Sequence, residues 1–407
     1  MSTKDLQVAV IGGGAAGFFS AISAKKHNPD AKVTIYEKTD RLLSKVRISG
    51  GGRCNVTHYC FDIRELVKFY PRGERPLKKA FGIWSTTDTV EWFESRGVKL
   101  KTESDGRMFP ITDDSETIIN CLLEETRKLG IGIKTKANIK SISKTEDGYE
   151  LGFHRGGRKS AEKVIVATGG SPRAKGFDWL RELGHEIEEP VPSLFTFNMP
   201  DEPIKELMGV VAEPVAIKIM GSNLSSSGPL LVTHWGMSGP AVLKLSAFGA
   251  RDFHKMDYEF KILVNWAGDR GEQEVRSILK EVENDHPKKK ISNVNPFELP
   301  GRLWEFLLNK LNLGDDMIWQ NMGKKNINRL VHLLSNDVYQ VQGKTTFKEE
   351  FVTCGGISLL DVDIKTMESR KSPGLYFAGE VLDIDGVTGG FNFQAAWTTG
   401  FIAGKLD

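Results

Sequence analysis

The feature that most restricts the fold is a Gly-x-Gly-x-x-Gly turn near the N-terminus, formed by Gly12, Gly14 and Gly17. An apolar run of β-formers at 6–11 precedes it, and helix-like residues 15–27 follow. In a βαβ unit the first glycine permits a tight turn, the second lets a pyrophosphate approach the backbone, and the third packs the helix against the strand. The free N–H groups of the helix N-terminus then attract the anion. This pattern predicts a parallel sheet that binds a dinucleotide.

An acidic residue at the end of the next predicted strand supports this interpretation. The strand covers residues 32–36, and Glu37 follows it, twenty residues after Gly17. A carboxylate at this place can bind the hydroxyl groups of a ribose. It also disfavours a 2′-phosphate, so we do not expect NADP at this site.

The C-terminal part of the sequence decides between NAD and FAD. FAD is longer and needs additional contacts for its ribityl chain and its ring. Residues 374–383 (GLYFAGEVLD) predict an apolar strand that delivers a glycine and acidic side chains to a loop, and residues 389–392 (GGFN) open a helix. The N-terminus of that helix can face the N1–C2=O edge of a flavin, where negative charge develops on reduction. We therefore expect FAD.

Length and composition limit the organisation of the chain. With 407 residues the chain is expected to form two or three domains. A hydrophobic content of 40% with 27% charged residues is typical of globular proteins, and no apolar run approaches the roughly 18 residues of a membrane helix. Residues 1–5 lack an apolar signal region. We expect a cytoplasmic protein without a membrane partner.

Charge and cysteine usage exclude further classes of site. The net charge of +2 gives no support to a nucleic-acid partner, so we expect a small-molecule substrate instead. The cysteines lack a Cys-x-x-Cys pair and histidines at zinc spacing, so no metal site is expected. They are interpreted as reduced thiols: Cys54, Cys60, Cys121 and Cys354.

The pattern of the sequence changes twice along the chain. From Ser193 to about Trp266 short strands at 211–219, 230–233 and 258–264 indicate an all-β insert. From Gly271 to about Asp337 the apolar period becomes helical. The Gly-rich C-terminal stretch is expected to rejoin the first domain. The predicted fold class is therefore α/β, with a Rossmann-like domain built from both chain ends.

Several runs of sequence carry a resemblance to a known family: IGGGAAG at 11–17, ISGGGRCNVT at 48–57, GRMFP at 106–110, ATGG at 167–170, THWGMSGPA at 233–241, and GLYFAGEVLDIDGVTGGFNFQAAWTTG at 374–400. On these runs nearly the whole chain resembles the BaiN/YhiN-like NAD(P)/FAD-dependent oxidoreductases, bacterial flavoproteins of the glutathione-reductase-like group. The resemblance implies an FAD domain interrupted by a β-barrel that itself carries a small helical module. We assign residues 1–193 and 348–407 to the FAD-binding domain, 194–267 and 338–347 to the barrel, and 268–337 to the helical insert.

The resemblance also implies a set of FAD contacts. These are Ala16, Glu37, Lys38, Lys45, Asn55, Glu380, Asn392 and Phe393, with a backbone contact near Ile139 to the adenine. The charge of Lys45 or Arg47 can neutralise a phosphate, and the backbone of residues 50–52 can form an anion-binding nest. The same motifs predict eight further cofactor-binding residues: Gly12, Gly14, Ala15, Gly17, Thr168, Gly169, Gly379 and Gln394.

No catalytic acid or base is evident, but three residues are considered. Cys54 lies among glycines beside Arg53, which can lower a thiol pKa, although the spacing to Cys60 is not that of a disulfide reductase. His234 can act as an acid or base near neutral pH. Arg107 can bind an anionic substrate. For Cys54 and His234 a purely structural role is favoured, and for Arg107 a surface role is as good an interpretation as substrate binding.

The sequence leaves the reaction partners open. Because no second Gly-x-Gly-x-x-Gly is present, there is no permanent NAD(P) domain, so either NADH or NADPH docks transiently on the flavin or the substrate reduces it directly and oxygen reoxidises it. The main hypothesis is an FAD-dependent oxidoreductase that transfers hydride to or from a small organic molecule. The alternatives are FAD-dependent modification of RNA and non-catalytic flavin binding. The oligomeric state is not predicted.

Overall fold

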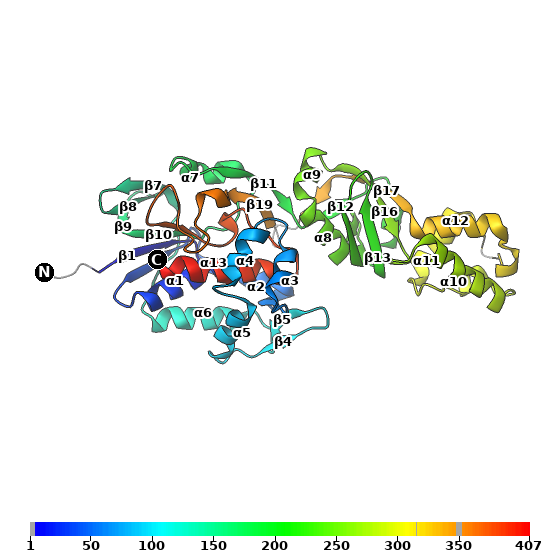
Figure 1. Ribbon diagram of the computed structural model, residues 1–407, viewed down its shortest axis with the longest axis horizontal. Coiled ribbons are helices and arrows are strands. Elements are labelled where there is room, and N and C mark those ends of the chain that lie inside the picture. The colour runs from blue at the N-terminus through cyan, green and yellow to red at the C-terminus, as the bar shows by residue number, and fades with distance from the viewer. Residues whose placement is uncertain (1–4, 315, 347–351) are drawn as a thin grey trace. The chain divides into compact units, whose positions relative to one another are not determined.

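The computed structural model describes residues 5–314, 316–346 and 352–407. The chain divides into two compact units, shown in Figure 1: Met1–Ser193 with Lys348–Asp407, and Leu194–Phe347. The first unit therefore combines both chain ends. Contacts between residues separate only these two units. A separate helical domain at 268–337 therefore stays a prediction.

A five-stranded sheet forms the centre of the first unit. All of its pairings are parallel, and the apolar residues of four of its strands are buried, as expected for a sheet covered on both faces, whereas the edge strand at 132–134 is exposed. The predicted strand from the far C-terminus indeed lies beside the strand that ends in the ATGG run. The strand order is β20 (Leu375–Phe377), β10 (Lys163–Val166), β1 (Gln7–Ile11), β2 (Lys32–Tyr36) and β6 (Gly132–Lys134).

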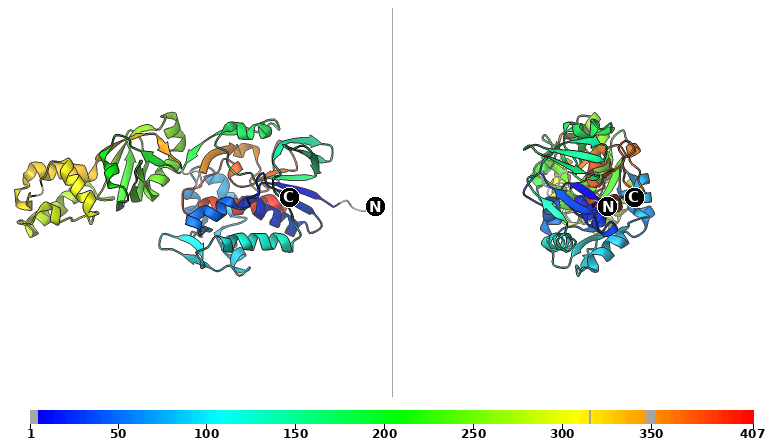
Figure 2. Two further views of the ribbon diagram at one scale, coloured as in Figure 1. Left: turned by 180° about the vertical axis from the view of Figure 1, so that it is seen from behind. Right: turned by 90° about the vertical axis from the view of Figure 1, so that its left-hand side faces the viewer.

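Two helices from opposite ends of the chain, α1 (Ala15–His27) and α13 (Phe391–Lys405), lie side by side in this unit (Figures 1 and 2). Glycines on α13 permit the close approach. A Cβ atom at Gly400 would lie 2.9 Å from the carbonyl oxygen of Ala16, and one at Gly404 would lie 2.4 Å from that of Ser20. Any side chain at Gly404 would therefore force the two helices apart.

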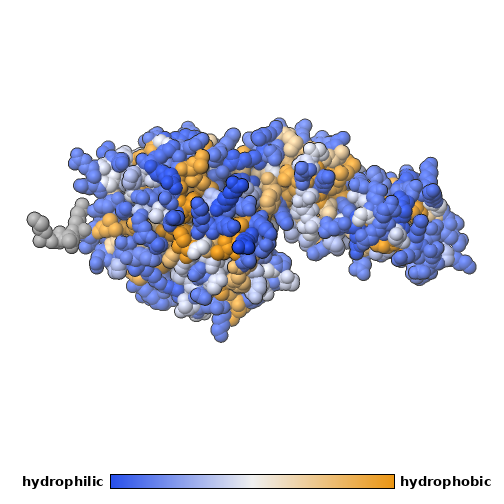
Figure 3. Space-filling view, viewed as in Figure 1, coloured by the Kyte–Doolittle hydropathy of each residue, from blue (hydrophilic) through white to orange (hydrophobic). Residues whose placement is uncertain are grey.

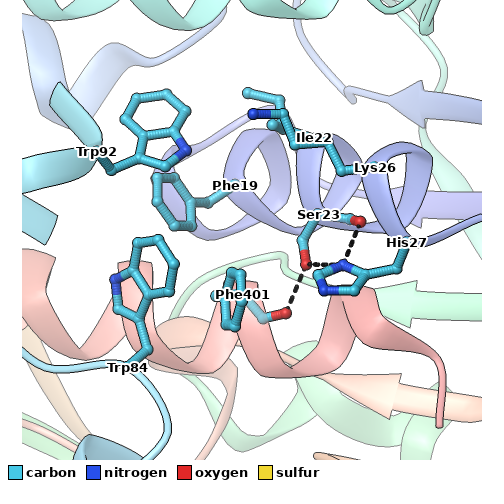
Figure 4. A pocket seen from close by; sticks show the side chains of 8 residues that line it. All are labelled: Phe19, Ile22, Ser23, Lys26, His27, Trp84, Trp92 and Phe401. Atoms are coloured by element: carbon cyan, nitrogen blue, oxygen red, sulfur yellow. Dashed lines mark hydrogen bonds between the residues drawn. The ribbon is translucent and has the colours of Figure 1, made fainter. Parts of the chain in front are cut away.

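An aromatic cluster packs between these helices and the segment that follows α4 (Glu74–Phe81). Figure 4 shows the rings of Phe19, Trp84, Trp92 and Phe401 around a small apolar pocket. The ring of Phe19 lies 5.4 Å from that of Trp84 and 4.8 Å from that of Trp92, and Trp84 lies 4.0 Å from Phe401. The Ser23 hydroxyl donates to the Phe401 carbonyl at 2.7 Å, which ties α1 to α13.

The remaining elements of the first unit surround the sheet. The helices are α2 (Ser44–Gly52), α3 (Ile63–Leu66), α4 (Glu74–Phe81), α5 (Thr86–Glu94), α6 (Glu116–Lys128) and α7 (Asp178–Arg181). Three small antiparallel sheets join β3 (Thr57–His58), β5 (Arg107–Pro110) and β4 (Leu100–Thr102); β7 (Ile139–Thr145), β8 (Gly148–Phe153) and β9 (Arg158–Ala161); and β11 (Ile187–Ser193) with β19 (Val352–Ile357).

The second unit contains a seven-stranded sheet in which every pairing is antiparallel. Its order is β17 (Asp337–Gln342), β16 (Glu259–Asn265), β13 (Val211–Ile219), β14 (Ser225–Val232), β15 (Gly236–Ser238), β12 (Thr196–Asn198) and β18 (Lys344–Thr345). Closure of this sheet into a barrel stays a prediction.

The prediction that residues 193–266 are all-β was wrong. Two helices, α8 (Pro240–Phe248) and α9 (Ala250–Lys255), stand between β15 and β16. The local signal was present, because Gly239 adopts a φ of +90° and Pro240 occupies the first helical turn. Proline at that position favours helix initiation.

Three longer helices, α10 (Glu272–Asp285), α11 (Gly301–Lys310) and α12 (Gly323–Ser335), follow as the helical period predicts. Their apolar faces bury Val275, Leu279, Leu307 and Leu330, whereas the surface over these helices in Figure 3 is largely hydrophilic. Among the residues described, no helix is long and apolar enough to cross a membrane.

Candidate functional site

The glycine turn between β1 and α1 has the geometry of a pyrophosphate cradle. Gly12 has a φ of +114°, and a Cβ there would lie 2.2 Å from the Ala167 carbonyl oxygen. A Cβ at Gly17 would lie 1.9 Å from the Gly12 carbonyl oxygen. At Gly14, by contrast, a Cβ would meet no protein atom within 4 Å. Gly12 and Gly17 are required by packing, and the open space above Gly14 fits the pyrophosphate of a dinucleotide.

The helices α1 and α13 share an N-terminal chemistry that suits a negatively charged ligand. Each begins at a glycine, Gly14 or Gly390, that offers no side-chain cap, and neither has an acidic residue in its first turn. The first N–H groups and the positive end of each helix dipole are thus left for a ligand. Gly379 has a φ of +75°, and its Cβ would lie 2.7 Å from the Cβ of Ala16, so the C-terminal motif packs directly on the first turn of α1.

Glu37 is bound to the glycine turn. Its Oε2 accepts from the Gly13 N–H at 2.8 Å, and its Oε1 accepts from the N–H and the hydroxyl of Thr39, both at 2.8 Å. The segment that carries the predicted adenine-side residue Ile139 lies close to Glu37 in space, because the N–H of Ala137, two residues before it, donates to the Glu37 carbonyl at 2.8 Å. Lys38 is exposed beside them.

We expect Glu37→Ala to weaken FAD binding. Loss of a charged hydrogen bond costs about 1–3 kcal/mol, which corresponds to roughly a 5- to 150-fold rise in Kd. Fluorescence titration of the apoprotein with FAD measures this change. Asp40→Ala, at an exposed position three residues along, is the control and should leave the Kd unchanged. Equal Kd values for the two variants would show that Glu37 does not hold the ribose.

Lys45, Glu380 and the loop after β10 come together within the first unit. The Lys45 Nζ donates to the Glu380 carboxylate at 2.6 Å, and that carboxylate also accepts from the Thr353 N–H at 3.2 Å. Gly169 has a φ of +75° with Thr168 before it, and a Cβ on the adjoining Gly170 would lie 3.2 Å from the Glu380 carboxyl carbon. The ammonium of Lys45 is half-exposed and can neutralise a phosphate.

Arg47 is directed elsewhere, because its guanidinium is paired with Glu116 of α6. The triplet at 50–52 is an ordered turn in which all three glycines have positive φ. Gly50 packs closely, since a Cβ there would lie 2.7 Å from the Phe109 ring, whereas Gly51 and Gly52 are open. Lys45 thus contacts the C-terminal motif and Arg47 contacts α6, and a phosphate contact by either residue stays a prediction.

Asparagine side chains order the start of α13. Asn55 is buried, and its side-chain oxygen accepts from the Gly390 N–H at 3.0 Å while its amide nitrogen donates to the Thr57 carbonyl at 2.9 Å. Asn392 accepts from the Gly386 N–H at 2.8 Å and donates to the Gly386 carbonyl at 2.9 Å. Both residues therefore shape the loop and helix N-terminus that would meet the flavin.

The two neighbours of Asn392 have different surroundings. Phe393 is half-buried and stacks on Trp397 with ring centroids 5.7 Å apart. Gln394 is fully buried, and its amide bonds the hydroxyls of three threonines, Thr57 at 2.7 Å, Thr89 at 3.0 Å and Thr398 at 3.1 Å. Its side chain therefore anchors α13 inside the protein, which leaves it no free group for a cofactor.

The three catalytic candidates have different local surroundings. Arg107 is held by ion pairs with Asp105 at 2.6 Å and Glu103 at 2.9 Å. His234 is exposed in the second unit, between β14 and β15. Cys54 is fully buried, and this burial raises the pKa of its thiol to about 12. Cys54 is a protonated packing residue at neutral pH, which argues against a redox role.

Because of that pKa, we expect Cys54 to resist alkylation in the folded protein from pH 7 to pH 9, where its thiolate fraction stays on the order of one in a thousand or less. Cys60, which is only partly buried, serves as the internal control and should react faster as the pH rises. Mass spectrometry of peptides after iodoacetamide treatment measures both rates. Similar rates at the two thiols would contradict the burial of Cys54.

Sequence reasoning missed two supports of α13. His58 Nδ1 contacts the Gly389 carbonyl at 3.0 Å, its ring stacks on Phe391 at 4.5 Å, and burial lowers the pKa of its imidazole. The Tyr70 hydroxyl donates to the Phe391 carbonyl at 2.7 Å. These partners are more than 300 residues apart in sequence, so no local signal could have joined them.

Comparison with known proteins places this geometry in a family. The model of the HI0933-like protein Rossmann domain matches residues 6–406. The chain is 26% identical to a 3-dehydro-bile acid Δ(4,6)-reductase of Clostridium scindens, covering 98% of each chain. It is 29% identical to a ribosomal RNA dihydrouridine synthase of Escherichia coli, covering 96% of this chain and 95% of the relative.

Among solved structures, a 3-ketosteroid Δ4-(5α)-dehydrogenase of Rhodococcus jostii matches with a TM-score of 0.51 at 12% identity, over 100% of this chain and 98% of the other. That match shows the fold alone. The family match extends over nearly the entire sequence, and the open space above Gly14 fits the pyrophosphate of a dinucleotide. The chain therefore belongs to the HI0933-like Rossmann-domain family.

Proposed function

We propose that this protein reduces a carbon–carbon double bond conjugated to a carbonyl group, with NADH or NADPH as the electron donor. The observation that carries the proposal is the nearly full-length similarity to two relatives whose names describe this one type of reaction on unlike molecules. A Δ(4,6)-reductase of a 3-oxo bile acid and a synthase of dihydrouridine both add hydrogen across such a bond. The two relatives thus share a reaction type but act on different substrates.

The residues of the first unit support this chemistry. Bound FAD supplies the hydride for such a reduction. The open backbone at Gly14 and the N-terminus of α1 would hold the pyrophosphate, Glu37 would bind the ribose, and Lys45 would neutralise a phosphate. The N-terminus of α13, without an acidic residue in its first turn, would stabilise negative charge on the reduced ring.

Two substrate classes are weighed. A small enone is the first choice, because a net charge of +2 gives no support to a surface that binds a polyanion such as RNA. Uracil within ribosomal RNA is the second, and the identity of 29% to the RNA-modifying relative favours it. In either case a nicotinamide must dock transiently, since the sequence holds no second Gly-x-Gly-x-x-Gly.

An anaerobic experiment on the FAD-loaded protein tests the proposal. NADH or NADPH is added first, and bleaching of the flavin absorbance reports its reduction. The reduced protein is then mixed either with a 3-oxo-Δ4 steroid or with unmodified ribosomal RNA, and the return of the absorbance is followed. Reoxidation by one of them, with two hydrogens gained by that product in mass spectrometry, is the expected result. If neither compound reoxidises the flavin and only the later admission of oxygen does, the proposal is overturned in favour of an oxidase.

A further inference from the structure

A buried ion pair lies on the loop that joins β20 to α13. We call residues 379–390 the flavin loop, because it begins at Gly379 against the first turn of α1 and ends at the N-cap of α13. Asp385 belongs to this loop, and its side chain is fully buried. Its partner Arg72 comes from a distant segment of the chain and has a side chain that is 11% exposed. The Arg72 guanidinium binds both carboxylate oxygens of Asp385 in the bidentate manner, with the Nε to Oδ1 distance at 2.5 Å.

The segment that carries Arg72 runs along the flavin loop. Arg72 and Asp385 form an antiparallel bridge, and the Val387 N–H donates to the Phe69 carbonyl at 2.9 Å. The Tyr70 hydroxyl donates to the Phe391 carbonyl in the first turn of α13 at 2.7 Å. The loop is thus fixed on this side from its middle to the start of the helix.

Carboxylates of the flavin loop hold its other side. Asp385 Oδ2 accepts from the Ser193 hydroxyl at 2.8 Å, at the end of β11. Asp383 accepts from the Gly355 N–H at 2.9 Å and Glu380 from the Thr353 N–H at 3.2 Å, both on β19. Of these three carboxylates, Asp385 connects the flavin loop to both neighbouring segments, because it bonds Arg72 on one and Ser193 on the other.

We propose that Arg72 is a positioning residue for FAD: by neutralising Asp385 it holds the flavin loop, and with it Glu380 and the first turn of α13, in the arrangement that binds the flavin ring. A carboxylate removed from water this completely needs an opposite charge. Burial raises the pKa of Asp385 to about 6 while Arg72 opposes that rise, so the carboxylate is ionised and paired at pH 7.5. The proposal rests on FAD as the cofactor and not on the identity of the substrate.

The test compares Arg72→Lys and Arg72→Met in the full-length protein, with the Kd for FAD measured on the apoprotein and the potential on the FAD-loaded protein. Lysine keeps the charge but loses the bidentate geometry, whereas methionine leaves Asp385 without its partner. We expect the Kd for FAD to rise roughly tenfold for lysine and a hundredfold for methionine. The midpoint potential of the bound flavin should fall in the same order, because a displaced α13 N-terminus stabilises the reduced ring less.

Arg96→Met is the matched control. Arg96 is 16% exposed and forms an ion pair at 2.9 Å with Glu125, also in the first unit, but between α5 and α6 rather than on the flavin loop. A purely structural role for Arg72 predicts that Arg72→Met and Arg96→Met lower the melting temperature alike, with the potential and the visible circular dichroism of the flavin unchanged. That result would overturn the proposal. Should Arg72→Met not fold, the potential of Arg72→Lys decides, and a wild-type value would overturn it equally.

Discussion

Gly14→Asp is expected to yield a folded protein that does not bind FAD. The substitution meets no protein atom, since a Cβ at Gly14 has nothing within 4 Å, and its φ of −95° suits any residue. Aspartate at a helix N-cap stabilises the helix relative to glycine by about a few tenths of a kcal/mol. The same carboxylate, however, would accept hydrogen bonds from the N–H groups that the pyrophosphate needs and would occupy its space. Its negative charge would also repel the phosphates. We expect the Kd for FAD to rise by roughly a thousandfold or more.

The apoprotein's melting temperature and an FAD titration measure the two effects separately. Gly271→Asp provides the matched control, because Gly271 is also an uncapped N-cap glycine, at α10, with a φ of −78° and open space around its Cβ. This control should gain the same helix stability and keep FAD. Retention of FAD by Gly14→Asp would mean that the pyrophosphate is bound elsewhere.

Gly404→Leu is expected to cost about 3–5 kcal/mol of the free energy of unfolding. A Cβ at Gly404 would already lie 2.4 Å from the Ser20 carbonyl oxygen and 2.5 Å from the Ser23 Cβ, before the rest of the side chain is added. Overpacking of this kind forces backbone shifts, and a backbone oxygen cannot rotate away. Because the displaced helices are α1 and α13, FAD retention should fall as well.

Urea unfolding of the apoprotein measures this cost. Gly301→Leu in α11 is the comparison, because a Cβ at Gly301 meets nothing within 4 Å and leucine is a better helix former than glycine. That variant should be neutral or slightly more stable. Equal stability of Gly404→Leu and Gly301→Leu would show that α1 and α13 do not pack through Gly404.

Local sequence was enough for the features that depend on short segments. The strand, glycine turn and helix at 7–27 are one continuous piece, and the roles of Gly12 and Gly17 follow from backbone geometry that any such turn requires. Sequence also predicted that the C-terminal stretch rejoins the first domain, and the structure shows how, because β20 pairs in parallel with β10. The helices α8 and α9 were missed although Pro240 marks the start of one.

The partners of individual side chains needed the tertiary structure. Gln394 and Asn392 are two residues apart on α13, yet the former is bonded to three threonines inside the protein and the latter shapes the loop before the helix. Only the rotation of α13 against its neighbours decides which side each residue faces.

The glycine turn, Glu37 and the C-terminal motif were therefore determined by the sequence alone, because each is a short segment whose backbone chemistry is local. The tertiary structure alone decided that Asn55 accepts from the Gly390 N–H before α13, that Cys54 is buried and that Arg72 meets Asp385. The last two residues are 313 positions apart. Such contacts arise from the packing of distant segments, which no local pattern of residues encodes.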